Sequence, residues 1–500
     1  MWSISAFFAL SVLPSVPIPQ DVAITHVTVI DVGSGRSLPD RTVLIRGRHI
    51  ATVDTAPSTR LPQGTRQVDG RGRYLIPGLW DMHVHLVSDR LVRHNIFPLF
   101  IANGITGVRD MWGDCDSICA TSDSDARRPV PASTVQRWKQ EIRDGVLLGP
   151  RIVAASALFE GPAPMFPGSY AIHSADEARE MVRRAKEHGA DFIKVLPGVS
   201  RESYLAIMDE ANRQGLPVAG HVPFTMTSME VADAGQRSIE HLEDLLALGS
   251  YSHLSCYRDP EAVQTAFASM RMTRDSAERA RRQTDFRRLL TGNYSEELCA
   301  GVFAHLARKG TWRVPTLAVH YQGPMARLGD TLVIANPRLR YVGSGIMEGW
   351  RRPLPTVPPR TADDSAAIRA VARLSVAIPG AMHRAGVPLL AGTDMPNPWV
   401  IPGFSLHLEL ALLVEGGLTP LDAIRTATIN PARFLNATDS LGSIAPGYVA
   451  DLVLLDANPL ADIHHTERIR AVLVNGRLLE RSELDQLLAE AERAAGEGRH

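Results

Sequence analysis

The chain has 500 residues, of which 45% are hydrophobic, so it can bury a large core, and its length favours one large domain with a smaller one beside it. The 53 Lys and Arg nearly balance the 54 Asp and Glu, which excludes the strong overall charge used to bind nucleic acid or anionic membranes. We therefore expect a small neutral or zwitterionic substrate and no nucleic-acid partner.

The N-terminal segment has the composition of a targeting signal. Residues 2–18 are apolar and end in a Pro-rich stretch, so residues 1–20 resemble a signal peptide, although the Lys or Arg expected before the apolar core is missing. We expect an exported protein, periplasmic or secreted, with a cytoplasmic protein as the alternative. No later run approaches the ~20 apolar residues of a membrane-spanning helix, so we expect no membrane span.

Segments near both ends of the chain have the alternation typical of strands. VLIRGR at 43–48 and VLVNGR at 472–477 look like counterpart hairpins. We therefore predict that residues 21–75 and 435–480 together build one small β-sandwich domain. Residues 481–500 are charged and Ala-rich, which predicts a C-terminal helical tail.

The long middle of the chain, residues 76–434, alternates short apolar runs with amphipathic helical stretches. This pattern is typical of βα units around a parallel sheet. Eight runs close a (β/α)8, TIM-like barrel, whose reactive groups lie at the C-terminal ends of its strands. The predicted barrel strands lie at 79–85, 105–111, 151–159, 192–196, 218–222, 238–242, 312–317 and 389–394.

The four cysteines, at positions 115, 119, 256 and 299, include no CxxC pair. This spacing argues against both a disulfide framework and a thiolate zinc site. We expect Cys115 and Cys119 to be free thiols, with a bridge in an oxidising compartment as the alternative.

Four histidines and one aspartate come at the ends of predicted barrel strands. His83 and His85 lie two apart on one strand, so both side chains point to the same face, the barrel interior. His221 ends VAGH, His241 ends SIEH and Asp394 ends LLAGTD. Each alone has an ordinary explanation, a core histidine or a helix N-cap, but five together at one rim predict a site for Zn²⁺ or a similar ion.

Lys194 distinguishes between kinds of metal site. In DFIKVL it shares a face with Phe192 and Leu196, which places its amine inside the barrel beside the expected cations. A charged ammonium would be repelled there. The side chain is therefore either a neutral amine with a depressed pKa or a carbamate formed with carbon dioxide, unless it extends along the strand end to solvent.

These motifs resemble the amidohydrolase superfamily over residues 22–480. The resemblance rests on the HVH pair, the lysine of FIKVL, the histidines of AGHV and IEH, the GTD aspartate, and the closing NPA and APGYVADLVLLD segments. It implies two divalent metal ions, with Zn²⁺ expected, and a carbamylated Lys194 bridging them. It further implies that His83, His85 and Asp394 hold one ion and that His221 and His241 hold the other.

Within the superfamily, GADFIKVL, GLPVAGHV and residues 402–424 look most like the branch of Xaa-Pro dipeptidases and imidazolonepropionase relatives. The resemblance implies hydrolysis of a dipeptide or an N-acyl amino acid. Imidazolonepropionases use one metal without a bridging lysine, so Lys194 argues against that activity. His320 is a candidate substrate-binding residue with a loop role as its alternative, and His407 is expected to pack or to support the site. We also expect a homo-oligomer.

The mechanism expected from this set uses a metal-bridging hydroxide as nucleophile, with Asp394 taking a proton from the attacking water and returning it to the leaving nitrogen. Cyclic amides, lactones and phosphoesters are alternative substrates for such a centre. A catalytically inactive scaffold is an alternative of another class, but such proteins have lost metal ligands that are all present here.

Overall fold

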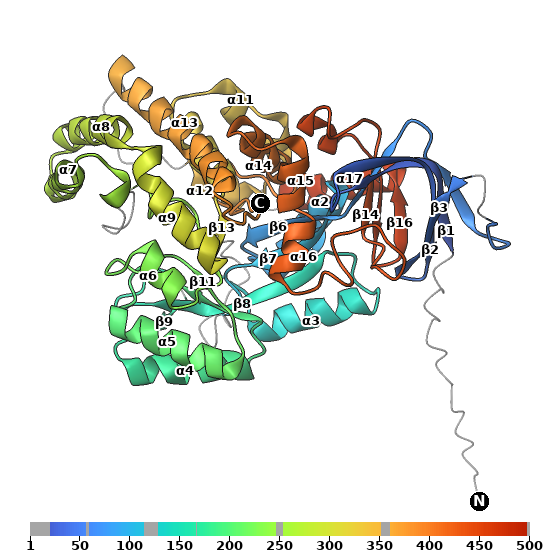
Figure 1. Cartoon of the computed structure of the whole chain (residues 1–500), viewed down its shortest axis with the longest axis horizontal. Coiled ribbons are helices and arrows are strands. Elements are labelled where there is room, and N and C mark those ends of the chain that lie inside the picture. The colour runs from blue at the N-terminus through green and yellow to red at the C-terminus, as the bar shows by residue number, and fades with distance from the viewer. Residues whose placement is uncertain are drawn as a thin grey trace, which may run out of the picture.

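The computed structural model describes residues 21–56, 60–114, 129–166, 168–246, 254–351 and 361–497. The expected signal peptide at 1–20 and the cysteines Cys115 and Cys119 lie outside these residues. Within them, the chain forms a barrel of parallel strands surrounded by helices, and a second sheet lies to one side of it (Figure 1). The mixed α/β fold class predicted from the sequence is confirmed.

The second sheet joins the two ends of the chain. Strand β1 pairs antiparallel with β2 on one side and parallel with β4 and β5 on the other, and β5 then pairs antiparallel with β14 from the C-terminal part. Both predicted hairpins are present, β2–β3 and β15–β16, and the second turns at Asn475 and Gly476, which both have positive φ. The eight strands are β1 (Val22–Asp31), β2 (Arg36–Arg46), β3 (His49–Thr55), β4 (Arg66–Asp69), β5 (Tyr74–Pro77), β14 (Leu452–Leu455), β15 (Ile469–Val474) and β16 (Arg477–Glu480).

Seven parallel strands form most of the barrel wall, in the order β6-β7-β8-β10-β11-β12-β13, and a two-residue strand, β9, pairs with β8. Their residues are almost all buried, as expected for strands covered by helices on one face and filling a barrel on the other. The strands are β6 (Leu79–Val84), β7 (Ile105–Asp110), β8 (Arg151–Glu160), β9 (Tyr170–Ala171), β10 (Phe192–Val195), β11 (Val218–Gly220), β12 (Ser238–Glu240) and β13 (Trp312–Val314).

The eighth predicted strand, 389–394, is not a regular strand, and this part of the prediction is wrong. The segment still closes the barrel, because it bridges to β13 at Leu389 and to β6 at Met395. The N–H of Leu390 donates to the carbonyl of Arg313 at 2.9 Å, and the N–H of Met82 donates to that of Ala391 at 2.9 Å. The segment ends where the chain turns at Asp394, whose φ is 63°.

Helices cover the outside of the barrel and fill the long connections after β12 and β13 (Figure 1). N-cap residues begin several of these helices: the side chains of Ser174 and Ser200 accept hydrogen bonds from the first turns of α4 and α5. No helix in the described part of the chain has the length and apolarity needed to cross a bilayer. The α-helices are α1 (Asp89–Leu91), α2 (Phe97–Ala102), α3 (Ala132–Arg143), α4 (Ala175–Glu187), α5 (Arg201–Gln214), α6 (Ser228–Asp233), α7 (Pro260–Met272), α8 (Ser276–Asn293), α9 (Glu296–Lys309), α10 (Leu317–Arg327), α11 (Thr331–Ile334), α12 (Ser344–Arg351), α13 (Ala362–Arg384), α14 (Phe404–Glu415), α15 (Pro420–Thr426), α16 (Ile429–Phe434) and the expected C-terminal helix α17 (Arg481–Gly496).

A disulfide joins Cys256 to Cys299 across 43 positions, contrary to the expectation that the cysteines argue against disulfides. Both residues are buried, and the N–H of Ser295 donates to the carbonyl of Cys256 at 2.9 Å, which holds the start of α9 against the segment after β12. Spacing alone could not reveal the pair, because only the packing of α9 brings the two positions together.

Candidate metal centre

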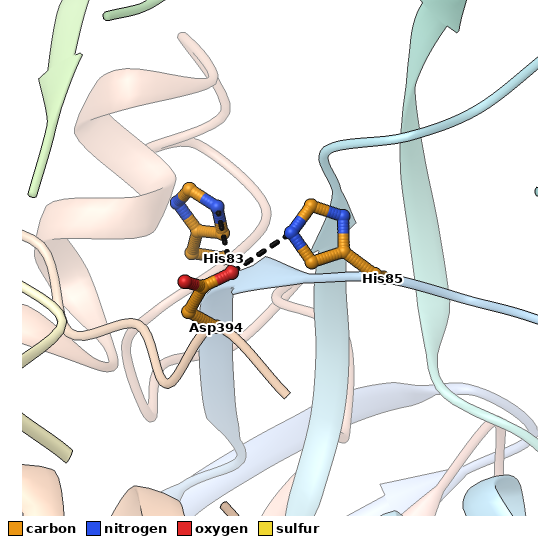
Figure 2. Close-up of side chains that lie close together, drawn as sticks. All are labelled: His83, His85 and Asp394. Carbon is orange, nitrogen blue, oxygen red and sulfur yellow. Dashed lines mark hydrogen bonds and ion pairs between the residues drawn. The ribbon is translucent and has the colours of Figure 1, made fainter. Parts of the chain in front are cut away.

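His83, His85 and Asp394 meet at the C-terminal end of β6. Both imidazoles point toward the carboxylate of Asp394, whose Oδ1 lies 2.8 Å from His85 Nε2 and 3.4 Å from His83 Nε2 (Figure 2). One ligand atom from each of the three residues lies within 4.8 Å of the others. Three donor atoms this close can share one cation, as the family resemblance implied for the first metal.

The position of Asp394 follows from how the eighth segment is fastened to β6. The N–H of Asp394 donates to the carbonyl of His83 at 2.7 Å. One residue earlier, Thr393 donates to the buried carboxyl of Asp81 from its backbone N–H at 2.9 Å and from its hydroxyl at 2.7 Å. Burial raises the pKa of Asp81 to about 7, against the lowering effect of these hydrogen bonds. Asp81 therefore holds the metal-site aspartate in register with the histidine strand.

His241 and His221 extend the cluster along the rim. The ring centroid of His241 lies 4.7 Å from that of His83 and 4.9 Å from that of His221. Thr316, after β13, lies with its hydroxyl 2.8 Å from His241 Nδ1, which fixes the orientation of that ring. The structure thus brings the histidines from the ends of β6, β11 and β12 into one chain of neighbouring rings.

Lys194 is buried inside the barrel, as its predicted face requires. It is 2% exposed, and its strand neighbour Phe192 packs with Ala155 and Ala219 in a separate interior cluster. Burial lowers the pKa of Lys194 to about 8, although the charges of Glu240 and Asp394 act in the opposite direction. The predicted alternative of a lysine extended to solvent is therefore wrong.

Three histidines of the cluster, His83, His221 and His241, lie where the neutral imidazole is favoured. Burial, followed by the charge of Lys194, lowers the pKa of His221 to about 3 and that of His83 well below its ordinary value. Burial and the neighbouring rings do the same for His241. A neutral imidazole offers a lone pair, which is the form that binds a metal ion.

Sequence reasoning missed Glu240 and Arg109, which are completely buried beneath the histidines. Glu240 Oε2 accepts hydrogen bonds from His83 Nδ1 and from Arg109 Nη2, both at 2.8 Å. Arg109 also donates from Nε to the carbonyl of Met82 at 2.7 Å. Because Nδ1 of His83 is engaged in this way, its Nε2 faces Asp394 with the free lone pair. Charged residues inside the apolar runs ITGVRDM and SIEHL were the available signal.

His320 lies near the cluster and His407 does not. The His320 ring, on α10, lies 6.1 Å from that of His241, and burial lowers its pKa to about 4. The ring nitrogens of His407 lie instead 3.0 Å from the hydroxyl of Thr466 and 3.2 Å from the carbonyl of Asn103. His407 therefore connects α14 to other elements, in agreement with the packing role expected for it.

Aromatic side chains continue from the cluster toward the surface. Trp112, just after β7, lies 5.9 Å from His85 between ring centroids, and Phe166, after β8, lies 5.8 Å from Trp112. Phe166 is 42% exposed and its neighbour Met165 is 78% exposed. The backbone of this loop is held because Glu160 accepts hydrogen bonds from the N–H groups of both residues. An apolar surface thus adjoins His85.

Comparison with known proteins agrees with this geometry. The model of the amidohydrolase family matches residues 74–479. An ochratoxinase of Aspergillus niger is 26% identical to the chain, over 90% of the chain and 84% of that protein.

Solved structures share the fold at lower identity. A bottromycin amidohydrolase has a TM-score of 0.72 at 23% identity, over 96% of this chain and 91% of that one. A Xaa-Pro dipeptidase with methionine bound in its active site has a TM-score of 0.60 at 20% identity, over 92% of this chain and 100% of that one.

Proposed function

The chain belongs to the amidohydrolase family, and on that premise we propose that it hydrolyses the amide bond of a dipeptide or an N-acyl amino acid with two divalent cations, Zn²⁺ in the first instance. The gathering of His83, His85 and Asp394 within 4.8 Å, beside the buried Lys194, is the observation that carries the proposal. The similarity to enzymes named ochratoxinase and Xaa-Pro dipeptidase supports the choice of substrate class.

The residues present fit the metal ions that the family implies. Among the described residues, the buried ring atoms His83 Nε2 and His221 Nδ1 have no hydrogen-bond partner. Burying a polar atom without a partner is costly, and a cation offsets that cost for a lone pair. His83, His85 and Asp394 would hold one ion, and His221 and His241 the other, with Lys194 between them. Bound ions would polarise the substrate carbonyl and lower the pKa of water from about 15.7 toward about 7.

Asp394 is the proposed proton carrier. Its side chain is 10% exposed and faces both His83 and His85, so it can accept a proton from the attacking water. The same carboxyl then gives that proton to the departing nitrogen, and no covalent enzyme intermediate is needed.

Lys194 is proposed to act as a carbamate. Its neutral amine attacks carbon dioxide, a carbon–nitrogen bond forms as one carbon–oxygen π bond breaks, and the nitrogen loses one proton to solvent, so a neutral amine is replaced by an anion with two oxygens. Two features favour this change: the side chain is buried, and the positive charge of Arg109 further disfavours a charged ammonium at Lys194.

Metal analysis of the purified protein, combined with a substrate panel in bicarbonate buffer, tests the proposal. We expect about two equivalents of divalent metal and turnover of dipeptides or N-acyl amino acids, with Asp233→Asn as an exposed control variant. Turnover confined to lactones or phosphoesters would contradict the proposed bond type, and a protein that binds no divalent metal would contradict the centre itself.

We also propose that the chain is exported. The Cys256–Cys299 disulfide supports this location, because disulfides persist mainly in oxidising compartments. Fractionation of the native host tests it: we expect the protein outside the cytoplasm with this bond intact, and a reduced cytoplasmic protein would contradict the proposal.

A further inference from the structure

A cavity of about 570 Å³ lies at the end of the barrel opposite the histidine cluster. It is lined by residues at the starts of barrel strands, such as Arg151 of β8, Phe192 of β10 and Arg237 just before β12. Its other walls come from α3, from the turn between β15 and β16 and from residues 434–437. Because the metal ligands lie at the opposite ends of the same strands, the cavity is separate from the candidate metal centre.

Cationic side chains outnumber carboxylates in the lining. The only two carboxylates there each pair with a cation: Asp191 with Lys139 at 2.5 Å, and Asp451 with Arg151 Nε at 2.8 Å. The other cations of the lining are Arg48, Arg143 and Arg237, and none of these three forms an ion pair with a carboxylate of the described residues. The cavity therefore carries a surplus of positive charge.

Arg237 is partly buried without a carboxylate partner among the described residues. Its side chain is partly buried, which lowers its pKa, and its guanidinium donates from Nη2 to the carbonyl of Phe434 at 3.1 Å. It also lies 5.3 Å from the centre of the Phe434 ring. A carbonyl and a ring face compensate a desolvated guanidinium less well than an oxyanion does.

The same cavity has an apolar wall. Trp80, Phe192 and Phe434 line it and are all at least nine-tenths buried. Rings and guanidinium groups in one half-open cavity fit a ligand that has an apolar ring at one end and an oxyanion at the other. Inorganic phosphate or sulfate would contact the guanidinium groups and leave the apolar part of the lining exposed to water.

We propose that this cavity, defined by Arg48, Arg143, Arg237, Trp80, Phe192 and Phe434, binds a small organic anion that carries an oxyanion on an apolar ring. The oxyanion contacts the arginines and the ring packs on the aromatic wall. The site is distinct from the catalytic mouth, so the inference does not depend on the proposed hydrolase activity.

Titration calorimetry of the metal-loaded, full-length protein with 2-naphthoate tests the proposal. We expect a saturable site with a dissociation constant of about 1 mM or lower. The Arg143→Met/Arg237→Met variant should bind at least about tenfold more weakly, as should the neutral 2-naphthamide to the unchanged protein. Arg143 is exposed and its side chain donates to Gln140 on its own helix, so Arg143→Met alone gives a variant that keeps its fold if the double variant does not.

Two controls locate the bound probe. Arg213→Met removes an exposed arginine of α5 that pairs with Asp209 and should not change the affinity. Trp112→Ala alters the apolar surface beside His85 and reports any binding of the probe there. The proposal is overturned if 2-naphthoate does not saturate, if the arginine variants bind it as tightly as the unchanged protein, or if only Trp112→Ala weakens binding.

Discussion

The two ends of the barrel carry opposite kinds of chemistry. At the C-terminal end, neutral imidazoles, a carboxylate and a buried lysine converge, whereas at the N-terminal end guanidinium groups and aromatic rings surround a cavity. The same strands build both ends: β10 carries Lys194 near one end and Phe192 at the other. The barrel strands thus position the side chains at both ends, and the residue types at each strand end determine whether that end favours binding of a cation or of an anion.

One buried ion pair lies between the two ends. Arg109 binds Glu240, which in turn holds His83 at the mouth. On its other side, the Arg109 guanidinium lies 5.5 Å from the ring of Phe192 and 5.0 Å from that of Phe434. Both rings line the cavity at the N-terminal end of the barrel. We therefore expect variants of the histidine cluster, of the Arg109–Glu240 pair and of the cavity to change turnover, metal affinity and anion affinity separately.

Lys194→Ala should have the largest effect. We expect no measurable turnover, because the variant removes the proposed anion between the two metal ions, and we expect short carboxylic acids to restore part of the activity. Lys309→Ala, at an exposed ion pair with Asp233, is the matched control. Full metal content and full activity in Lys194→Ala would remove this lysine from the centre.

Asp394→Asn should lower kcat by about 10²- to 10⁴-fold, since that is the usual contribution of a positioned acid–base group. The amide keeps an oxygen toward His83 and His85, so the metal content measured by mass spectrometry should be retained. A variant with normal kcat would show that another group carries the proton.

Glu240→Gln should weaken metal binding by about 10- to 100-fold, because the carboxylate that orients His83 is replaced by a neutral amide. Chelator competition measures the effect. Arg143→Met, in the cavity at the N-terminal end of the barrel, should leave metal affinity unchanged. If both variants weaken metal binding equally, the two ends are not separable.

Trp112→Ala with Phe166→Ala should have the smallest effect, confined to substrates with large apolar acyl groups. We expect KM for an N-naphthoyl amino acid to rise about tenfold, because burying an aromatic group contributes about 1.5–3 kcal/mol. KM for the N-acetyl analogue should barely change. Leu332→Ala, at an 82% exposed position away from these rings, is the control. Equal changes for both substrates would show that the rings do not form an acyl-binding surface.

Much of the barrel and of its mouth was determined by the sequence. A side-chain period of two places His83 beside His85 on one face and puts Lys194 inside the barrel, and these local rules hold wherever a strand forms. Because parallel strands end at one rim, histidines and an aspartate at successive strand ends also had to lie near one another. The composite sheet likewise followed from alternation and from the turn residues of its hairpins.

Only the tertiary structure decided the contacts between positions that no local rule relates. Glu240 meets Arg109 across 131 positions, and Cys256 meets Cys299, because helices and strands pack in a particular way. The irregular eighth segment depends on hydrogen bonds that Asp81 and His83 supply from another strand. A periodic pattern specifies which face of an element is buried, whereas the partner on the other side of that buried face is set by the packing of the whole chain.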